Sequence, residues 1–159
     1  MPTDPVIRLA RASDAPRIAA MSRDLIESGL GWSWTAPRVL RSLADSQTNV
    51  VVALAGEQRI GFAIMKYHDD EAHLLLLAVQ PASGRRGVGT AMVEWLEKAA
   101  LVAGVGQVYL EARITNGAAR AFYKRLGYSE IQLVPGYYQG REASVRLAKD
   151  LWAERPTLA

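Results

Sequence analysis

The sequence has no cysteine among its 159 residues. Disulfide bonds and covalent intermediates on a cysteine thiol are therefore excluded, and this composition suits the cytoplasm, where thiols stay reduced. Histidine is also scarce, because His68 and His73 are the only two. Neither belongs to a cluster of residues with metal-ligand spacing. We therefore expect a cytoplasmic protein without a metal cofactor.

Long apolar runs are missing as well. No segment approaches the ~18 consecutive apolar residues of a membrane-spanning helix, and residues 1–9 lack the apolar region of a signal peptide. A strong excess of one charge is also absent, since 19 basic and 16 acidic residues leave a formal net charge of +3. This excess is too small and scattered for nucleic-acid binding, but it suits an anionic cofactor. We expect neither a membrane nor a nucleic acid as partner.

Hydrophobic residues make up 50% of the chain, which is typical of a globular protein. The length predicts a single domain over residues 1–159. Strand-like segments come first and then alternate with helical ones, which predicts an α/β fold with a mixed sheet. The predicted strands are 6–9, 50–55, 60–66, 72–79, 108–112, 128–134 and 143–147, and the predicted helices are 13–27, 37–44, 88–103 and 116–126.

A glycine-rich loop follows the apolar run 74–79 and opens the helical pattern at Val88. Its sequence, VQPASGRRGVGT over residues 79–90, has three glycines that allow the backbone to approach a ligand closely. The following helix start offers free N–H groups and a partial positive charge, which together favour a phosphate or pyrophosphate. The loop lacks the lysine of a P-loop and the glycine spacing of a dinucleotide-binding fingerprint. An ordinary glycine-rich turn is the alternative.

A second motif lies at residues 116–128, NGAARAFYKRLGY. Asn116 is a good N-cap, and Ala119, Phe122 and Leu126 share one face at helical spacing. Gly127 stands where a helix would end. The segment therefore predicts a short amphipathic helix after a strand.

Together the two motifs resemble those of the GNAT N-acetyltransferases, and the resemblance spans residues 6–151. It implies the GNAT fold, a mixed central sheet with splayed strands four and five and helices on both faces. It also implies acetyl-CoA as cosubstrate. Gly84 is a departure, because the family usually has glutamine or arginine there, and this puts one side-chain contact in doubt. The narrower resemblance is to the bacterial ribosomal-protein N-terminal alanine acetyltransferases.

The resemblance also implies the residues that bind coenzyme A. Backbone groups of Leu77 and Val79 would meet the pantetheine arm, and an N–H near Val79 would face the acetyl oxygen. Asn116 would bond the pantetheine as well as cap its helix. Arg120 would reach the 3′-phosphate, although a solvated arginine is an equal alternative. The pyrophosphate would lie on the loop residues Gly84, Arg85, Arg86, Gly87, Val88, Gly89 and Thr90.

The resemblance implies two catalytic residues. Tyr123 stands where the family places the tyrosine that protonates the leaving thiolate, although a core tyrosine is the alternative. Many members carry a glutamate base in the fourth strand, but this strand reads Leu74 to Leu77. Glu111, five residues before Asn116, matches the narrower group and is the candidate base; pairing with a surface arginine is the alternative. His73 is a weaker candidate for the base.

An amine acceptor is expected opposite the coenzyme. We expect the loop 29–35 with Trp32, and the segment 136–140 with Tyr137 and Tyr138, to contact it, although these aromatic residues could instead belong to a rim or a dimer. Glu27, at the end of the first predicted helix, is expected at the surface, with contact to a cationic amine as the alternative. The preferred acceptor is a peptide or protein α-amine, with a small amine or antibiotic, or a non-catalytic acyl-CoA-binding module, as alternatives. A monomer and a homodimer both fit.

Overall fold

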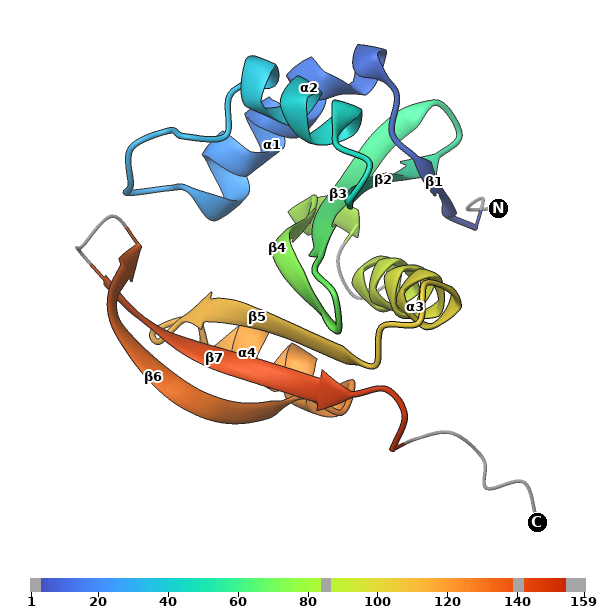
Figure 1. Ribbon diagram of the computed structural model, residues 1–159. Helices are drawn as coiled ribbons and strands as arrows, with labels where there is room; N and C mark the ends of the chain where they lie inside the picture. The colour runs from blue at the N-terminus through green and yellow to red at the C-terminus, as the bar shows by residue number, and fades with distance from the viewer. Residues whose placement is uncertain (1–3, 84–86, 139–141, 154–159) are drawn as a thin grey trace. The chain divides into compact units, whose positions relative to one another are not determined.

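The structure, a computed structural model, describes residues 4–83, 87–138 and 142–153 (Figure 1). The chain divides into two compact units. The first consists of Met1–Lys66 and Leu74–Lys98, and the second of Tyr67–His73 and Ala99–Ala159. The single domain over 1–159 therefore stays a prediction.

Four strands form the sheet of the first unit, in the order β1-β2-β3-β4. They are β1 (Val6–Leu9), β2 (Thr48–Ala55), β3 (Gln58–Tyr67) and β4 (Glu71–Val79), of which the end of β3 and the start of β4 belong to the second unit. β1 and β3 each pair antiparallel with β2. Gly56 has a φ of 61° in the turn between β2 and β3, so the predicted strands 50–55 and 60–66 form a hairpin.

The helices of this unit are α1 (Ala15–Met21), α2 (Ala36–Ala44) and most of α3 (Val88–Val102), with 3-10 turns at Ala12–Asp14 and Pro81–Ser83. Their apolar stripes bury against the sheet. Ile18 of α1, Val39 of α2 and Phe62 of β3 are completely buried in one cluster. Gly61 lets β3 pass close to its neighbour, since a Cβ there would lie 2.9 Å from the Ala78 carbonyl oxygen.

The first predicted helix, 13–27, is interrupted. After α1 the backbone widens into a π-helical turn, Ser22–Ile26, closed by a bond of 2.8 Å from the Glu27 N–H to the Ser22 carbonyl oxygen. The Ser22 hydroxyl also donates to the Glu27 carboxylate at 2.9 Å. Periodicity alone does not reveal this turn, because the side-chain bond that accompanies it leaves no periodic signal.

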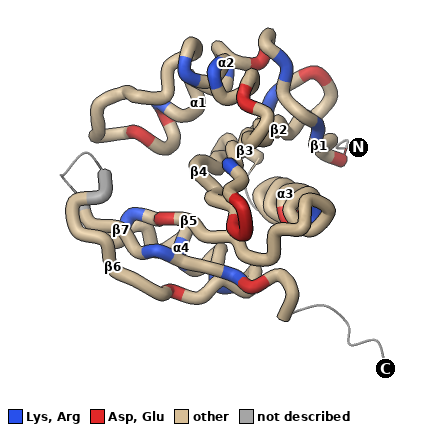
Figure 2. Tube along the Cα trace, in the orientation of Figure 1, with Lys and Arg blue, Asp and Glu red and all other residues tan. Residues whose placement is uncertain are grey.

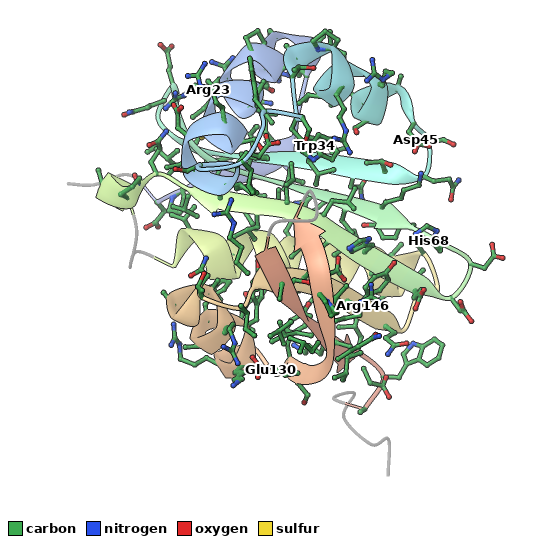
Figure 3. All side chains as sticks on the ribbon, turned by 90° about the vertical axis from the view of Figure 1, so that its left-hand side faces the viewer. Arg23, Trp34, Asp45, His68, Glu130 and Arg146 are labelled. Carbon is green, nitrogen blue, oxygen red and sulfur yellow. The ribbon has the colours of Figure 1, made fainter. Side chains whose placement is uncertain are left out.

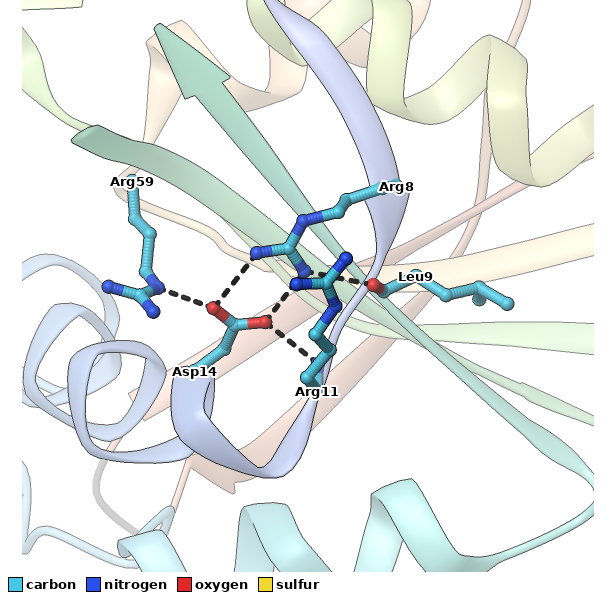
Figure 4. A network of polar contacts seen from close by, with 5 residues as sticks. All are labelled: Arg8, Leu9, Arg11, Asp14 and Arg59. Carbon is cyan, nitrogen blue, oxygen red and sulfur yellow. Dashed lines mark hydrogen bonds and ion pairs between the residues drawn. The ribbon is translucent and has the colours of Figure 1, made fainter. Parts of the chain in front are cut away.

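Asp14 fastens α1 to two strands (Figure 4). Its buried carboxylate accepts from Arg8 of β1 at 2.8 Å and from the Arg11 backbone N–H at 2.7 Å, and it also binds Arg59 of β3. Burial alone would raise the pKa of this carboxyl, but the hydrogen bonds from Arg8, Arg11 and Arg59 hold the pKa well below its usual range. The ionised carboxylate therefore stabilises the folded unit.

The second unit has three antiparallel strands in the order β5-β7-β6. They are β5 (Gln107–Arg113), β6 (Ser129–Tyr138) and β7 (Glu142–Asp150), with α4 (Gly117–Arg125) between β5 and β6 in the chain. β6 and β7 are longer than predicted. Pro135, which cannot donate a ladder bond, is accommodated because β6 lies at the edge of this sheet.

The last described turn packs on a glycine. Leu151 donates its N–H to the Gly106 carbonyl oxygen at 2.7 Å. A Cβ at Gly106 would lie 2.4 Å from ring atoms of Trp152. Any side chain at position 106 would therefore displace the indole. No helix in the described parts of the chain is long and apolar enough to cross a bilayer.

Candidate active site

The loop that was predicted to bind an anion leads into α3. The preceding strand, β4, ends at Val79, and Gly87 immediately before α3 has a φ of 75°, in the left-handed region. A Cβ built on Gly87 would meet no atom within 4 Å, so the space there is open. The first N–H groups of a helix have no partner within it, and here they belong to Val88, Gly89 and Thr90. Gly84, Arg85 and Arg86 lie outside the described residues.

The end of β4 has one face in the core and one that is only partly covered. Leu76 and Ala78 are buried, whereas Leu77 and Val79 are half-buried. The two predicted pantetheine-binding residues thus share the partly covered face of the strand. Binding of the pantetheine arm by these two residues stays a prediction.

The second motif forms the short helix that the sequence predicts. The Asn116 side chain accepts from the Ala119 N–H at 3.0 Å, which confirms the predicted N-cap. Gly127 has a φ of 98°, and Tyr128 donates its N–H to the Tyr123 carbonyl oxygen at 3.0 Å, an arrangement that ends the helix. The predicted boundaries of α4 are therefore confirmed.

Arg120 is engaged within the second unit. Its guanidinium donates to both carboxylate oxygens of Glu130, at 2.7 and 3.1 Å, and to the Ile114 carbonyl oxygen at 2.9 Å. Lys124 lies 3.3 Å from the same carboxylate. The hydrogen bond from Arg120, followed by that from Lys124, lowers the pKa of Glu130 to about 2. Arg120 would have to exchange this partner to bind a phosphate, and its predicted role stays a prediction.

Tyr123 is buried in α4, with 8% of its surface exposed. Its ring meets those of Phe122 and Tyr128 edge to face, with centroids 5.0 and 5.8 Å away. The ring is therefore held in one orientation, as both a general acid and a core tyrosine require.

Glu111 lies at the centre of a polar cluster in the second unit. Its side chain is 1% exposed. One carboxylate oxygen lies 2.6 Å from His73 Nε2, and the other accepts from Arg146 Nε at 2.8 Å. Arg146 stands directly opposite Glu111 in the β5–β7 register. Glu111, the predicted candidate base, is thus paired with Arg146. It is also paired with His73, the weaker candidate for the base.

Tyr109 completes this cluster. Its ring stacks on His73 with centroids 4.2 Å apart, and the Arg146 guanidinium lies 5.2 Å from the ring centroid. Burial, with smaller contributions from Glu71 and Glu111, raises the pKa of Tyr109. The neutral phenol ring packs against the imidazole and restricts its rotation. His73, 15% exposed, is the more accessible member of its pair with Glu111.

Tyr109 and Arg146 were not singled out by sequence. A signal for Tyr109 was available, since alternation places it on the same face of β5 as Glu111. Arg146 is the one charge within the apolar stretch 143–148. Its pairing depends on the strand register, which the sequence does not specify.

The loop before α2 is fastened by Glu27. This carboxylate is buried and accepts from the Ser33 N–H and hydroxyl, both at 2.7 Å, and from the Trp34 N–H at 3.3 Å. Burial raises the pKa of Glu27, but these bonds outweigh it and the pKa is lowered. The expectation that Glu27 lies at the surface is wrong, because the loop folds back and supplies three donors.

Trp32, predicted to contact the acceptor, is exposed on this loop. Its indole N–H donates to the Trp34 carbonyl oxygen at 3.1 Å, and the Arg23 guanidinium lies 5.4 Å from its ring. The backbones of Tyr137 and Tyr138 belong to β6, whereas their side chains lie outside the described part of the structure. All three contacts with an acceptor stay predictions.

Comparison with solved structures identifies the class. The ribosomal-protein alanine N-acetyltransferase from Escherichia coli superposes with a TM-score of 0.80 at 26% identity, over 98% of this chain and 99% of that one. The α/β fold is therefore that of the N-acetyltransferases, as the sequence predicts. The chain belongs to the acetyltransferase (GNAT) family, whose model matches residues 18–128. The family predicted from the two motifs is confirmed.

Curated relatives support the same placement. The ribosomal protein bS18 alanine N-acetyltransferase of Salmonella typhimurium is 37% identical over 97 residues, which are 59% of this chain and 66% of that protein. An N-alpha-acetyltransferase of Sulfolobus acidocaldarius is 27% identical over 154 residues, 91% of this chain and 92% of that one. The chain spans 58–66% of the first bacterial and archaeal relatives that it matches. The predicted similarity to the ribosomal-protein alanine acetyltransferases is also confirmed.

Proposed function

We propose that this protein is an acetyl-CoA-dependent N-acetyltransferase that transfers the acetyl group directly to the α-amine of a peptide or protein. The observation that carries this proposal is the open start of α3 behind the left-handed Gly87, in a chain of the GNAT family. Relatives named as alanine and N-alpha acetyltransferases favour an α-amine over a small amine or an antibiotic.

The pyrophosphate of acetyl-CoA would lie on the N–H groups at the start of α3. Three features fit it: the N-terminus of a helix of 15 residues, no Cβ at Gly87, and no described atom within 4 Å of where that Cβ would lie. Backbone groups of Leu77 and Val79 would bind the pantetheine arm, and Asn116 and Arg120 would contribute side chains from the second motif. Trp32, Tyr137 and Tyr138 would contact the acceptor.

The reaction requires two proton movements. The neutral amine nitrogen attacks the thioester carbonyl carbon, the C–S bond breaks, and the CoA thiolate takes a proton from the Tyr123 hydroxyl. The amine loses its own proton to a base. The fixed orientation of the Tyr123 ring between Phe122 and Tyr128 supports its role as the acid.

Glu111 would act as base together with His73. Both oxygens of its carboxylate are already engaged and its side chain is 1% exposed, so direct contact with an amine would require losing a partner. When Glu111 is ionised, the His73 Nε2–H donates a hydrogen bond to its carboxylate, which leaves Nδ1 of that ring as an acceptor. We therefore assign proton uptake to the pair, through water bound to His73.

An α-amine demands little of this base. Its pKa is about 8, so roughly a tenth is neutral at pH 7, whereas a lysine with a pKa of about 10.4 is neutral in only about one molecule in a few thousand. A histidine–carboxylate pair is therefore a sufficient base for an α-amine. This is consistent with a fourth strand that carries no glutamate between residues 74 and 79.

The decisive experiment is acetylation of short synthetic peptides, followed by mass spectrometry and by release of free CoA. Peptides with a free N-terminus should gain one acetyl group at the α-amine. Matched peptides with a blocked N-terminus and an internal lysine should not react. Equal modification of both would refute the α-amine assignment, and binding of CoA without turnover on any amine would refute the enzyme itself.

A further inference from the structure

A basic cleft of about 280 Å³ runs along α2 in the first unit. Trp34 and Asp45, labelled in Figure 3, stand just before and just after this helix, and both line the cleft. Arg38 and Arg41 contribute from α2 itself, which carries basic but no acidic residues (Figure 2). Lys66 of β3 and Leu75 of β4 also line the cleft.

The charges in this cleft are unbalanced. Arg38, Arg41 and Lys66 face a single anion, Asp45, so the lining carries two excess positive charges. The Asp45 carboxylate already accepts from the Gln47 N–H at 2.9 Å and from the Thr48 hydroxyl at 2.8 Å, and Lys66 Nζ lies 3.8 Å away. The bond from the Gln47 backbone, followed by that from Thr48, lowers the pKa of Asp45.

The two arginines have no carboxylate partner within the described residues. They stand one turn apart on the same side of α2, where like charges repel. The Arg38 guanidinium lies 3.8 Å from the Trp34 ring centroid, and this stacking fixes its plane without neutralising its charge. A fixed guanidinium offers paired N–H donors to a carboxylate. The cleft is therefore prepared for an anion, and its volume is just below the ~300–1000 Å³ of small-molecule sites.

The position of the cleft identifies the anion. Leu75 lies two to four residues from Leu77 and Val79 along β4, or about 7–13 Å at the rise of a strand. If the acetyl group is transferred near Leu77 and Val79, as the proposed function requires, an extended peptide covers this distance with two to four residues. The occupant is then a side chain close to the N-terminus of the acceptor.

We propose that this cleft binds an acidic side chain within the first four or so residues of the acceptor, so that the enzyme selects peptides with an acidic N-terminal segment. The inference rests on the proposed function. It extends that function by naming a substrate class, which the family assignment does not supply. The two arginines would act mainly on peptide binding, because they touch the peptide away from the reacting amine.

The test compares three peptides of equal length. At positions two to four, the first carries Asp or Glu, the second Ser and the third Lys. Wild-type kcat/KM should be highest for the acidic peptide by about tenfold or more, mainly through KM, since a hydrogen bond to a charged group is stronger than one between neutral groups. The preference should fall with added salt. Arg41→Glu, and the milder double variant Arg38→Gln with Arg41→Gln, should remove it while activity on the Ser peptide persists.

The matched control is Lys98→Glu, which makes the same charge change at an exposed position of α3, ten residues beyond its start. It should keep the acidic preference. A second readout is calorimetric binding of the N-acetylated acidic peptide, which needs no turnover. Equal kcat/KM and equal binding for the three peptides would overturn the inference and leave the proposed function intact. If no peptide is acetylated, the proposed function fails. Calorimetry then decides for the cleft by itself, if Arg41→Glu loses binding of the acidic peptide.

Discussion

His73 Nε2 lies 2.6 Å from a carboxylate oxygen of Glu111, whose other oxygen accepts a hydrogen bond from Arg146 at 2.8 Å. The carboxylate therefore has no free oxygen facing an amine, and the histidine is the more exposed of the two. The arrangement divides one role between two residues. Glu111 orients the imidazole, and His73 is the group that can meet a proton.

This division predicts the behaviour of the two single variants. Glu111→Gln and His73→Asn should each lower kcat/KM by about 100-fold or more at neutral pH, the lower end for loss of a general base. The double variant should be little worse than either single one, because the residues act as a unit. Multiplied losses in the double variant would show two independent roles.

The pH dependence separates a catalytic role from a structural one. Both variants should recover part of their activity above pH 8, where solvent supplies the neutral α-amine. Arg146 keeps the Glu111 carboxylate as its partner in His73→Asn but loses this charge in Glu111→Gln, so each profile is compared with that of the wild type. A pH–rate profile parallel to that of the wild type in Glu111→Gln would instead assign the base to another group.

The Tyr123 hydroxyl can be tested against a close neighbour. Tyr123→Phe keeps the ring that packs on Phe122 and Tyr128 but removes the proton donor, so kcat should fall by about 100- to 10,000-fold with unchanged CoA affinity. Tyr128→Phe is the matched control, since Tyr128 is also buried and contacts the same ring. Wild-type turnover in Tyr123→Phe would make Tyr123 a structural residue.

The start of α3 can be tested with a pair of glycines. Gly87→Ala places a side chain at a φ of 75°, which costs roughly 1–2 kcal/mol and shifts the backbone that should meet the pyrophosphate. Calorimetry should show clearly weaker CoA binding. Gly104→Ala introduces the same strain beyond the other end of α3, at a φ of 82°, also with open space around the new Cβ. CoA affinities that fall equally in the two variants would contradict the assignment.

Asp14 should control the acid stability of the fold. Its pKa is depressed in the folded chain, so its contribution is complete above the ordinary carboxyl pKa of about 4 and is lost as the pH falls through the lower folded value. Asp14→Asn should lower the free energy of unfolding at pH 7 by about 3 kcal/mol, because Arg8 and Arg59 lose a buried partner. The variant should also lose less stability than the wild type on acidification.

Thermal unfolding from pH 7 down to pH 3 measures both effects. Asp24→Asn is the control, since Asp24 forms an exposed pair with Arg23 and should change the melting temperature little. A similar fall in both variants would show that burial of the Asp14 carboxylate is not what matters.

Local sequence signals predicted the parts of the fold that depend on periodicity and caps. The apolar run of β4, the helix start at Val88, and the Asn116 cap with its terminal Gly127 all needed only neighbouring residues. The interruption of the first helix was missed because the π-helical turn at Ser22–Ile26, accompanied by the bond between Ser22 and Glu27, leaves no mark on the apolar periodicity.

The polar partners in the candidate site are far apart in the sequence, and local patterns do not predict contacts over such separations. Glu111 meets His73 from 38 residues away and Arg146 from 35, and both contacts depend on how the strands align. The sequence could only offer an arginine as an alternative partner for Glu111. Glu27 was placed at the surface because charged side chains usually are, and three of its four donors come from a loop without periodicity.

The packing of Trp152 on Gly106 has a practical consequence for handling the protein. The indole covers the backbone of Gly106, immediately before β5. A shorter chain that ends before Leu151 would leave this backbone exposed to water and to proteases. Affinity tags and fluorescent fusions joined beyond Ala153 preserve the seal. Kinetic comparisons among Glu111, His73 and Tyr123 variants are therefore best made on chains that keep this last turn.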